Sequence, residues 1–170
     1  MTAKYVFISY GMGGAGIEYW DSGLRQLVKR CRALGYDTFG SPYNWSDVNA
    51  IVSEINQAPA DALIAVGGAS LGSNEAPDIA DRTKRRIKYL FGFQTSVWGY
   101  RTGIPANVER ADNIYNPSWL QTFGLGYGKW YPDPGNVRTI IRNIPIYAPH
   151  PDDWGAAQDI IYSQIHKWMG

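Results

Sequence analysis

The sequence predicts an α/β fold, a three-layer sandwich in which a mostly parallel central sheet lies between two layers of helices. Short apolar runs alternate with amphipathic helical segments through the first half of the chain. One run, Asp61 to Gly67, is apolar on both faces, as expected of a strand that helices cover on both sides. The 170 residues show no low-complexity linker, so we expect a single domain over residues 1–170.

The first half of the chain contains the expected elements in regular order. A strand at residues 5–9 ends in the glycine-rich loop 10–16. The next helix has apolar positions at helical spacing, and Gly35 is its expected C-cap. These positions are Trp20, Leu24, Leu27, Val28, Cys31 and Leu34. We then expect a strand at 36–39, a turn at 40–42, a helix from about Trp45 through Ile55, and a strand at 61–67.

The second half is less regular. We expect a helix over residues 74–82, with Pro77 in its first turn, and a strand at 87–93. A short strand at 112–116 precedes a long glycine- and aromatic-rich loop at 119–135. The strand expected at 142–147 contains Pro145, which favours the edge of the sheet. Five apolar residues at helical spacing predict a closing helix: Ala157, Ile160, Ile161, Ile165 and Trp168.

Composition and charge exclude several classes of function. With 45% hydrophobic and 18% charged residues, the chain is typical neither of a disordered nor of a membrane-spanning protein. A net charge of +1 gives no reason to expect a nucleic-acid partner. The basic residues between 82 and 88 are interpreted as a solvated helix end before a strand. Because no export signal precedes the first strand, a cytoplasmic location is the default expectation.

The sequence contains no recognisable metal or cofactor site. Its single cysteine, Cys31, excludes an intrachain disulfide and a zinc site built from several cysteines. There is no histidine pair at ligand spacing and no Walker lysine. Gly11, Gly13 and Gly16 match the dinucleotide fingerprint G-x-G-x-x-G, but no acidic residue ends the second expected strand. We therefore expect no cofactor and no metal.

The segment Gly68-Ala69-Ser70-Leu71-Gly72 matches the pattern G-x-S-x-G. It follows the buried strand and precedes a helix-compatible segment. In such a sharp turn the serine backbone is strained, and side chains at the two glycine positions would collide. The serine hydroxyl then stands clear of the sheet as a nucleophile does. The alternative is an ordinary strand-to-helix turn whose serine caps the helix.

A serine nucleophile needs a base, and the chain offers two histidines. His166 lies within the last predicted helix and is interpreted as a residue on its flank. His150 follows the last predicted strand, so its loop is expected at the same edge of the sheet as Ser70. The alternative for His150 is an ordinary surface loop residue.

These features together resemble the α/β-hydrolase superfamily, especially its small lipase, esterase and cutinase-like members. Residues 66–76 (VGGASLGSNEA) resemble the family's strand, nucleophile turn and helix, and residues 7–14 resemble its earlier strand and oxyanion loop. The order of Ser70 first and His150 last also fits. The resemblance implies a minimal hydrolase-like core without a lid domain, acting on an ester of unspecified identity.

The resemblance also implies roles for individual residues. Ser70 would attack a carbonyl carbon and His150 would take the serine proton. The backbone N–H groups of Leu71 and of Met12 or Gly11 would hold the oxyanion.

The chain departs from the family at the acid that should orient His150. The expected position, within Asn116-Pro117-Ser118-Trp119, holds no carboxylate. Asp112 is the candidate acid, although it begins its expected strand instead of ending it. Other candidates are Asp133, Asp152 and Asp153, with Asn116 or Ser118 as neutral substitutes. The chain could therefore be a slow enzyme, a dyad enzyme or a non-catalytic binding or assembly module. Such a module would use the Trp- and Tyr-rich loops between Trp98 and Trp130.

Overall fold

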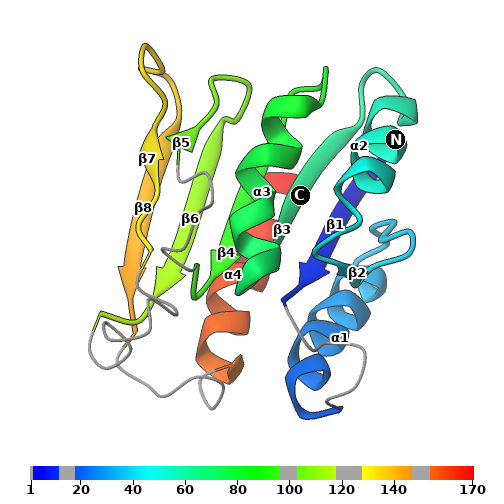
Figure 1. The fold of residues 1–170 in the computed structure, drawn as a ribbon. Coiled ribbons are helices and arrows are strands. Elements are labelled where there is room, and N and C mark those ends of the chain that lie inside the picture. The colour runs from blue at the N-terminus through cyan, green and yellow to red at the C-terminus, as the bar shows by residue number, and fades with distance from the viewer. Residues whose placement is uncertain (1, 12–17, 96–102, 118–127, 147–153) are drawn as a thin grey trace.

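The computed structural model describes residues 2–11, 18–95, 103–117, 128–146 and 154–170, and in these residues six parallel strands form the central sheet (Figure 1). The strand order is β2-β1-β3-β4-β6-β8. The strands are β1 (Lys4–Tyr10), β2 (Tyr43–Asn44), β3 (Leu63–Ala69), β4 (Tyr89–Phe93), β6 (Arg110–Tyr115) and β8 (Ile140–Pro145). We call the edge where these strands end the carboxyl edge, and the opposite one the amino edge.

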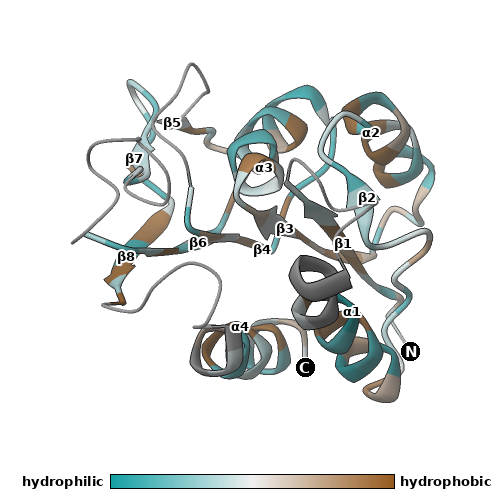
Figure 2. Ribbon diagram, turned by 60° about the horizontal axis from the view of Figure 1, so that its bottom comes forward, coloured by the Kyte–Doolittle hydropathy of each residue, from teal (hydrophilic) through white to brown (hydrophobic). Residues whose placement is uncertain are grey.

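Helices cover both faces of the sheet. In Figure 2, α2 (Val48–Gln57) and α3 (Leu71–Arg82) lie above the sheet, and α1 (Glu18–Ala33) and α4 (Trp154–Met169) lie below it. Each layer has its own apolar core, because successive side chains of a strand point to opposite faces. In β4, Phe91 packs toward α1 and α4, whereas Leu90 packs toward α2 and α3. The predicted three-layer α/β sandwich is confirmed.

The apolar stripes expected from the sequence form these cores. Leu24, Leu27 and Cys31 of α1 are fully buried against one face of the sheet. Ile51 and Ile55 of α2 are buried on the other face. Gly35 follows α1 with φ +79°, the left-handed conformation expected of a C-cap glycine.

Strand β1 lies at the point where the order of the sheet reverses. The chain leaves β1 through α1 to β2 on one side, then crosses through α2 to β3 on the other side of β1. In open α/β sheets, ligands bind in the crevice at the carboxyl ends of the strands that flank such a reversal. The ends of β1 and β3 therefore mark the place where a site is expected.

Two elements depart most from the sequence-based expectation. The strand predicted at 36–39 is reduced to a single bridge between Tyr5 and Asp37, and β2 pairs with β1 only at 43–44. Phe39 has φ +44° and stacks on Phe7, so the chain leaves the sheet early. Helix α3 begins at Leu71, three residues before the expected start, and therefore encloses Pro77, whose ring is buried.

The stretch predicted as a long loop contains a strand. Within residues 119–135, β7 (Tyr131–Pro132) pairs with β5 (Gly103–Ile104) in a small second sheet. Two-residue strands carry no hydrophobic periodicity, so the sequence could not predict this pair. Strand β8 spans 140–145 in place of the predicted 142–147, and it lies at the edge of the sheet, as Pro145 indicated. Among the described residues, no helix is both long and apolar enough to cross a membrane.

Candidate active site

Ser70 is the single residue between β3 and α3, and its backbone is strained. Its φ of 51° and ψ of −120° lie outside the regions that residues with a side chain normally occupy. Such a conformation costs on the order of 1–3 kcal/mol and persists only where its surroundings fix it. The Ser70 N–H donates to the Phe93 carbonyl at 2.9 Å, and the Ser70 carbonyl accepts from the Ser73 N–H at 3.0 Å. The sharp strand-to-helix turn predicted from the sequence is present.

The two glycines around Ser70 allow the turn to pack against β1. A Cβ on Gly68 would lie 2.4 Å from the Ser9 carbonyl oxygen and 2.7 Å from the Gly72 carbonyl carbon. A Cβ on Gly72 would lie 2.5 Å from the same Ser9 oxygen. These contacts are with backbone atoms, which cannot move aside. Both glycines are therefore required by sterics, as the G-x-S-x-G pattern predicted.

Gly11 places the backbone that follows β1 directly against the Ser70 side chain. A Cβ on Gly11 would lie 2.7 Å from the Ser70 Cβ and 3.1 Å from its Oγ. The carboxyl ends of β1 and β3 thus meet at Ser70, in the crevice expected from the strand order.

The start of α3, next to Ser70, suits an anion. The Ser70 hydroxyl makes no capping hydrogen bond to α3, so the alternative in which Ser70 caps the helix is not observed. Leu71 is the first residue of α3, and its N–H has no acceptor within the helix. Helix N-termini favour negative charge through these unpaired N–H groups. Met12, the other expected donor besides Gly11, lies outside the described residues.

The two histidines have different places in the chain. His166 is exposed in the last turn of α4. The end of this helix lies near the start of β1, because the Gly170 carbonyl accepts a hydrogen bond from the Lys4 side chain. His166 therefore lies toward the amino edge, away from Ser70. His150 lies outside the described residues, in the segment between Ile146, which follows β8 at the carboxyl edge, and Trp154.

Asp112, the candidate acid, is fully buried in an ion cluster on the α4 side of β6. The Arg142 Nε donates to Asp112 Oδ1 at 2.7 Å, and Arg142 Nη2 donates to Oδ2 at 2.5 Å. The Tyr89 hydroxyl donates to Oδ2 at 3.0 Å, and Arg110 lies 3.8 Å from Oδ1. In register Asp112 is level with Phe91 and Gly67, three residues before Ser70. The structure therefore does not bring Asp112 together with Ser70.

The other acid candidates are placed differently. Asp133 lies against Gly103 in the small β5–β7 sheet, and its N–H donates to the Ile104 carbonyl at 3.0 Å. Asn116 is buried immediately after β6, at the carboxyl edge. Ser118, Asp152 and Asp153 lie outside the described residues.

Two surface features have local structural explanations. Among the basic residues between α3 and β4, Arg85 donates to the Ala60 carbonyl at 3.1 Å, and Lys88 pairs with Glu109 at 2.8 Å. Trp130, from the aromatic-rich loop, is 1% exposed and packs against Gly92. Trp130 is therefore a core residue, which leaves it outside any contact surface.

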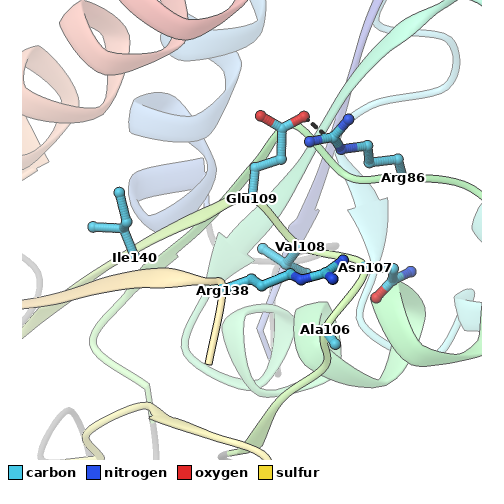
Figure 3. A pocket seen from close by; sticks show the side chains of 7 residues that line it. All are labelled: Arg86, Ala106, Asn107, Val108, Glu109, Arg138 and Ile140. Carbon is cyan, nitrogen blue, oxygen red and sulfur yellow. Dashed lines mark ion pairs between the residues drawn. The ribbon is translucent and has the colours of Figure 1, made fainter. Parts of the chain in front are cut away.

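The cavity shown in Figure 3 has a volume of about 570 Å³ and lies at the amino edge. Its lining comes from the segments before β4, β6 and β8, and the ion pair between Arg86 and Glu109 lies beside it at 2.8 Å. It contains none of the residues predicted for the Ser70 site.

One solved structure among the comparisons with known proteins bears on the fold. No protein-family model matches the chain, and no curated protein does. A solved structure from Xanthomonas campestris pv. campestris, assigned to the hydrolases of the alpha/beta superfamily, aligns over 96% of this chain and 98% of its own. The two share 12% sequence identity, with a TM-score of 0.60.

Two further solved structures align over nearly the whole chain with less similar geometry. Esterase PE8 covers 98% of this chain and 93% of its own, with 14% identity and a TM-score of 0.49. Acyl-protein thioesterase 2 from Zea mays covers 100% and 96%, with 10% identity and a TM-score of 0.46. At these scores neither structure bears on the assignment of the fold. The chain has the fold of the α/β hydrolases, as the resemblance in its sequence implied.

Proposed function

We propose that the protein is a serine hydrolase that cleaves a carboxylic ester with Ser70 as its nucleophile. The observation that carries the proposal is the backbone of Ser70, which has φ 51° in a turn that Gly11, Gly68 and Gly72 pack from three sides. Strain of this kind is concentrated at functional sites. The turn also lies at the crevice where the fold binds ligands.

In the proposed mechanism the Ser70 Oγ attacks the ester carbonyl carbon while His150 accepts the serine proton. The carbonyl π electrons move onto oxygen, and the N–H of Leu71 with that of Gly11 or Met12 stabilises the resulting oxyanion. Collapse of this intermediate expels the alcohol, which takes the proton from His150. Water then attacks the acyl-enzyme by the same route and releases the acid. Each oxyanion donor contributes roughly 3 kcal/mol of transition-state stabilisation.

The proposed mechanism uses Ser70 and His150 and assigns no carboxylate to orient the base. Asp112 is not included, because both of its oxygens accept hydrogen bonds from Arg142. We propose a structural role for Asp112 as the counter-ion of Arg142 and Arg110. We propose Asn116, which is buried at the carboxyl edge, as a neutral orienting group for His150.

The test is the hydrolysis of p-nitrophenyl butyrate by purified variants. We expect Ser70→Ala to abolish turnover and His150→Ala to lower kcat by about 10²- to 10⁴-fold, the range for loss of a general base. Ser53→Ala is the matched control, because Ser53 is exposed on α2 and bonds only Gln57 among the described residues. Its turnover should equal that of the wild type.

Three outcomes would count against the proposal. Turnover that survives Ser70→Ala would place the reaction elsewhere, and turnover unchanged in His150→Ala would exclude the assigned base. A folded wild type without turnover of any p-nitrophenyl ester would favour the non-catalytic binding module instead.

A further inference from the structure

A continuous chain of buried polar side chains runs from Ser70 across the α3 side of the sheet. The Ser73 hydroxyl donates to the Ser70 carbonyl at 2.7 Å and lies 3.0 Å from Thr95 Oγ1. The Thr95 hydroxyl donates to Asn113 Oδ1 at 2.7 Å, and Asn113 Nδ2 donates to Asn143 Oδ1 at 3.0 Å. Ser73, Thr95 and Asn113 are fully buried. Four segments, α3, the end of β4, β6 and β8, are thereby connected.

Backbone groups at the far end of this chain fix the direction of its hydrogen bonds. Asn113 Nδ2 also donates to the Gly128 carbonyl at 2.7 Å, and a carbonyl can only accept. Asn143 is held in the same way, because its Oδ1 accepts from the Trp130 N–H at 2.8 Å. Asn113 Oδ1 must therefore face Thr95, whose single proton it takes. A lone pair of Thr95 then faces Ser73.

The direction of these hydrogen bonds determines which acceptors the Ser73 hydroxyl has. Its one hydroxyl proton has two acceptors, the Ser70 carbonyl at 2.7 Å and Thr95 Oγ1 at 3.0 Å. Thr95 Oγ1 and the Ser70 carbonyl therefore share this proton, and together they set the rotation of the Ser73 hydroxyl. That carbonyl belongs to the strained residue and also accepts from the Ser73 and Asn74 N–H groups. The bonds hold the backbone that aims the Ser70 side chain.

We propose that Thr95 and Asn113 are positioning residues for Ser70, acting through Ser73. This inference rests on the proposed function, and it adds to it the residues that hold the nucleophile. Loss of the Thr95 hydroxyl would leave Asn113 Oδ1 buried without a donor and would remove one of the two acceptors of the Ser73 proton. A nucleophile displaced by about 1 Å can react on the order of 10²-fold more slowly.

The other end of α3 offers a matched control. Thr83 directly follows the last residue of α3 and is also buried. Its hydroxyl donates to Asn56 Oδ1 at 2.9 Å. Thr83→Val therefore removes the same kind of threonine–asparagine bond as Thr95→Val. Only the second of these bonds is connected to Ser70. Thr95→Ser retains the hydroxyl and is the conservative variant.

The experiment measures two quantities in folded wild type, Thr95→Val, Thr95→Ser and Thr83→Val. The first is the rate constant for attachment of a fluorophosphonate to Ser70. The second is hydrogen exchange at the Ser73 and Asn74 amides, which requires no chemistry at Ser70. We expect Thr95→Val to react about tenfold more slowly and to exchange faster at both amides. Thr95→Ser should resemble the wild type, and Thr83→Val should keep its labelling rate even if it is equally destabilised.

The inference is overturned if Thr95→Val matches Thr83→Val in both labelling and amide exchange. Its failure is distinct from that of the proposed function. If wild-type Ser70 is never labelled, the hydrolase proposal fails. Exchange at the Ser73 and Asn74 amides then decides whether Thr95 holds the turn.

Discussion

Asp112 and Asn113 are consecutive residues of β6, both fully buried and both polar, yet their side chains serve different layers of the molecule. Asp112 faces α4, where Arg142, Arg110 and Tyr89 surround its carboxylate. Asn113 faces α3 and bonds Thr95, at the start of the chain of hydrogen bonds that leads to Ser70. One residue along a strand reverses the face and therefore the partners.

The difference shows that ionisable character alone does not identify the residue that acts on a nucleophile. The sequence directed attention to Asp112 because a carboxylate was required near the end of this strand. In the structure the Asp112 carboxylate pairs with Arg142, and Asn113 is connected to the serine turn through Thr95 and Ser73. A buried charge needs a counter-charge, and Arg142 and Arg110 supply it to Asp112 on the α4 side of the sheet.

Among the variants that test this comparison, Asp112→Asn is expected to lower the free energy of unfolding most. The substitution keeps the shape of the side chain and removes the charge that Arg142 and Arg110 share. Breaking a buried ion pair on one side costs about 3–5 kcal/mol. Because the Arg142 side chain is 40% exposed, we expect the lower end, about 3 kcal/mol, in the free energy of unfolding measured with urea.

Labelling of Ser70 distinguishes this structural role from a catalytic one. At a temperature where Asp112→Asn is folded, its fluorophosphonate rate should equal that of the wild type. Loss of a triad acid typically lowers the rate by about 10⁴-fold. A fall in the labelling rate that approaches this size would show that Asp112 is the acid after all.

Asn113→Asp makes the reciprocal exchange and should have a smaller effect on stability. The new oxygen would face the Gly128 carbonyl, which would lose this donor, and Asn143 Oδ1, which would keep only the Trp130 N–H. We expect a loss of about 2 kcal/mol in the free energy of unfolding, from unsatisfied buried acceptors. The labelling rate of Ser70 should fall about tenfold, as for Thr95→Val. A wild-type labelling rate in this variant would show that the chain of hydrogen bonds does not position Ser70.

The smallest effect concerns pH, and it arises from Tyr89, which lies on the Asp112 side of β6. Burial, and then the Asp112 charge, raise the pKa of Tyr89 well above its ordinary value. Folded Tyr89 therefore keeps its proton at pH values where unfolded tyrosine ionises. Its contribution to stability is complete below pH ~10 and is lost as the pH rises further, by up to about 1.4 kcal/mol per pH unit.

Tyr89→Phe removes this titration and gives the measurement. Above pH ~10 the unfolding free energy of the variant should decline less steeply with pH than that of the wild type. Equal slopes in urea titrations would show that Tyr89 is not held protonated by the cluster around Asp112.

Much of the fold could be predicted from the sequence because its cues are local. The two apolar faces of β3, the stripe of α1 and the glycines around Ser70 each determine their own element within a few residues. The strand predicted at 36–39 was wrong because Phe39 leaves the sheet to stack on Phe7, a contact between segments far apart in sequence. The β5–β7 pair was missed because its strands are too short to show a pattern.

The site could be predicted only in part, for a similar reason. Ser70 was found from a local motif. The links from Ser73 to Thr95 and Asn113 depend on strand register, which places Gly92 of β4 level with Asn113 of β6. Threonine and asparagine are common in every loop and strand, so their types carry no signal until the register is known. The roles given to Ser70 and His150 remain predictions.

The central claim is that Ser70 reacts as a nucleophile, and covalent labelling tests it most directly. Wild-type protein and Ser70→Ala should be exposed to a fluorophosphonate, digested, and compared by mass spectrometry. We predict one adduct per chain, located on the peptide that carries Ser70, and none on Ser70→Ala. A folded wild type whose Ser70 peptide stays unmodified, or an adduct that persists in Ser70→Ala, would contradict the claim.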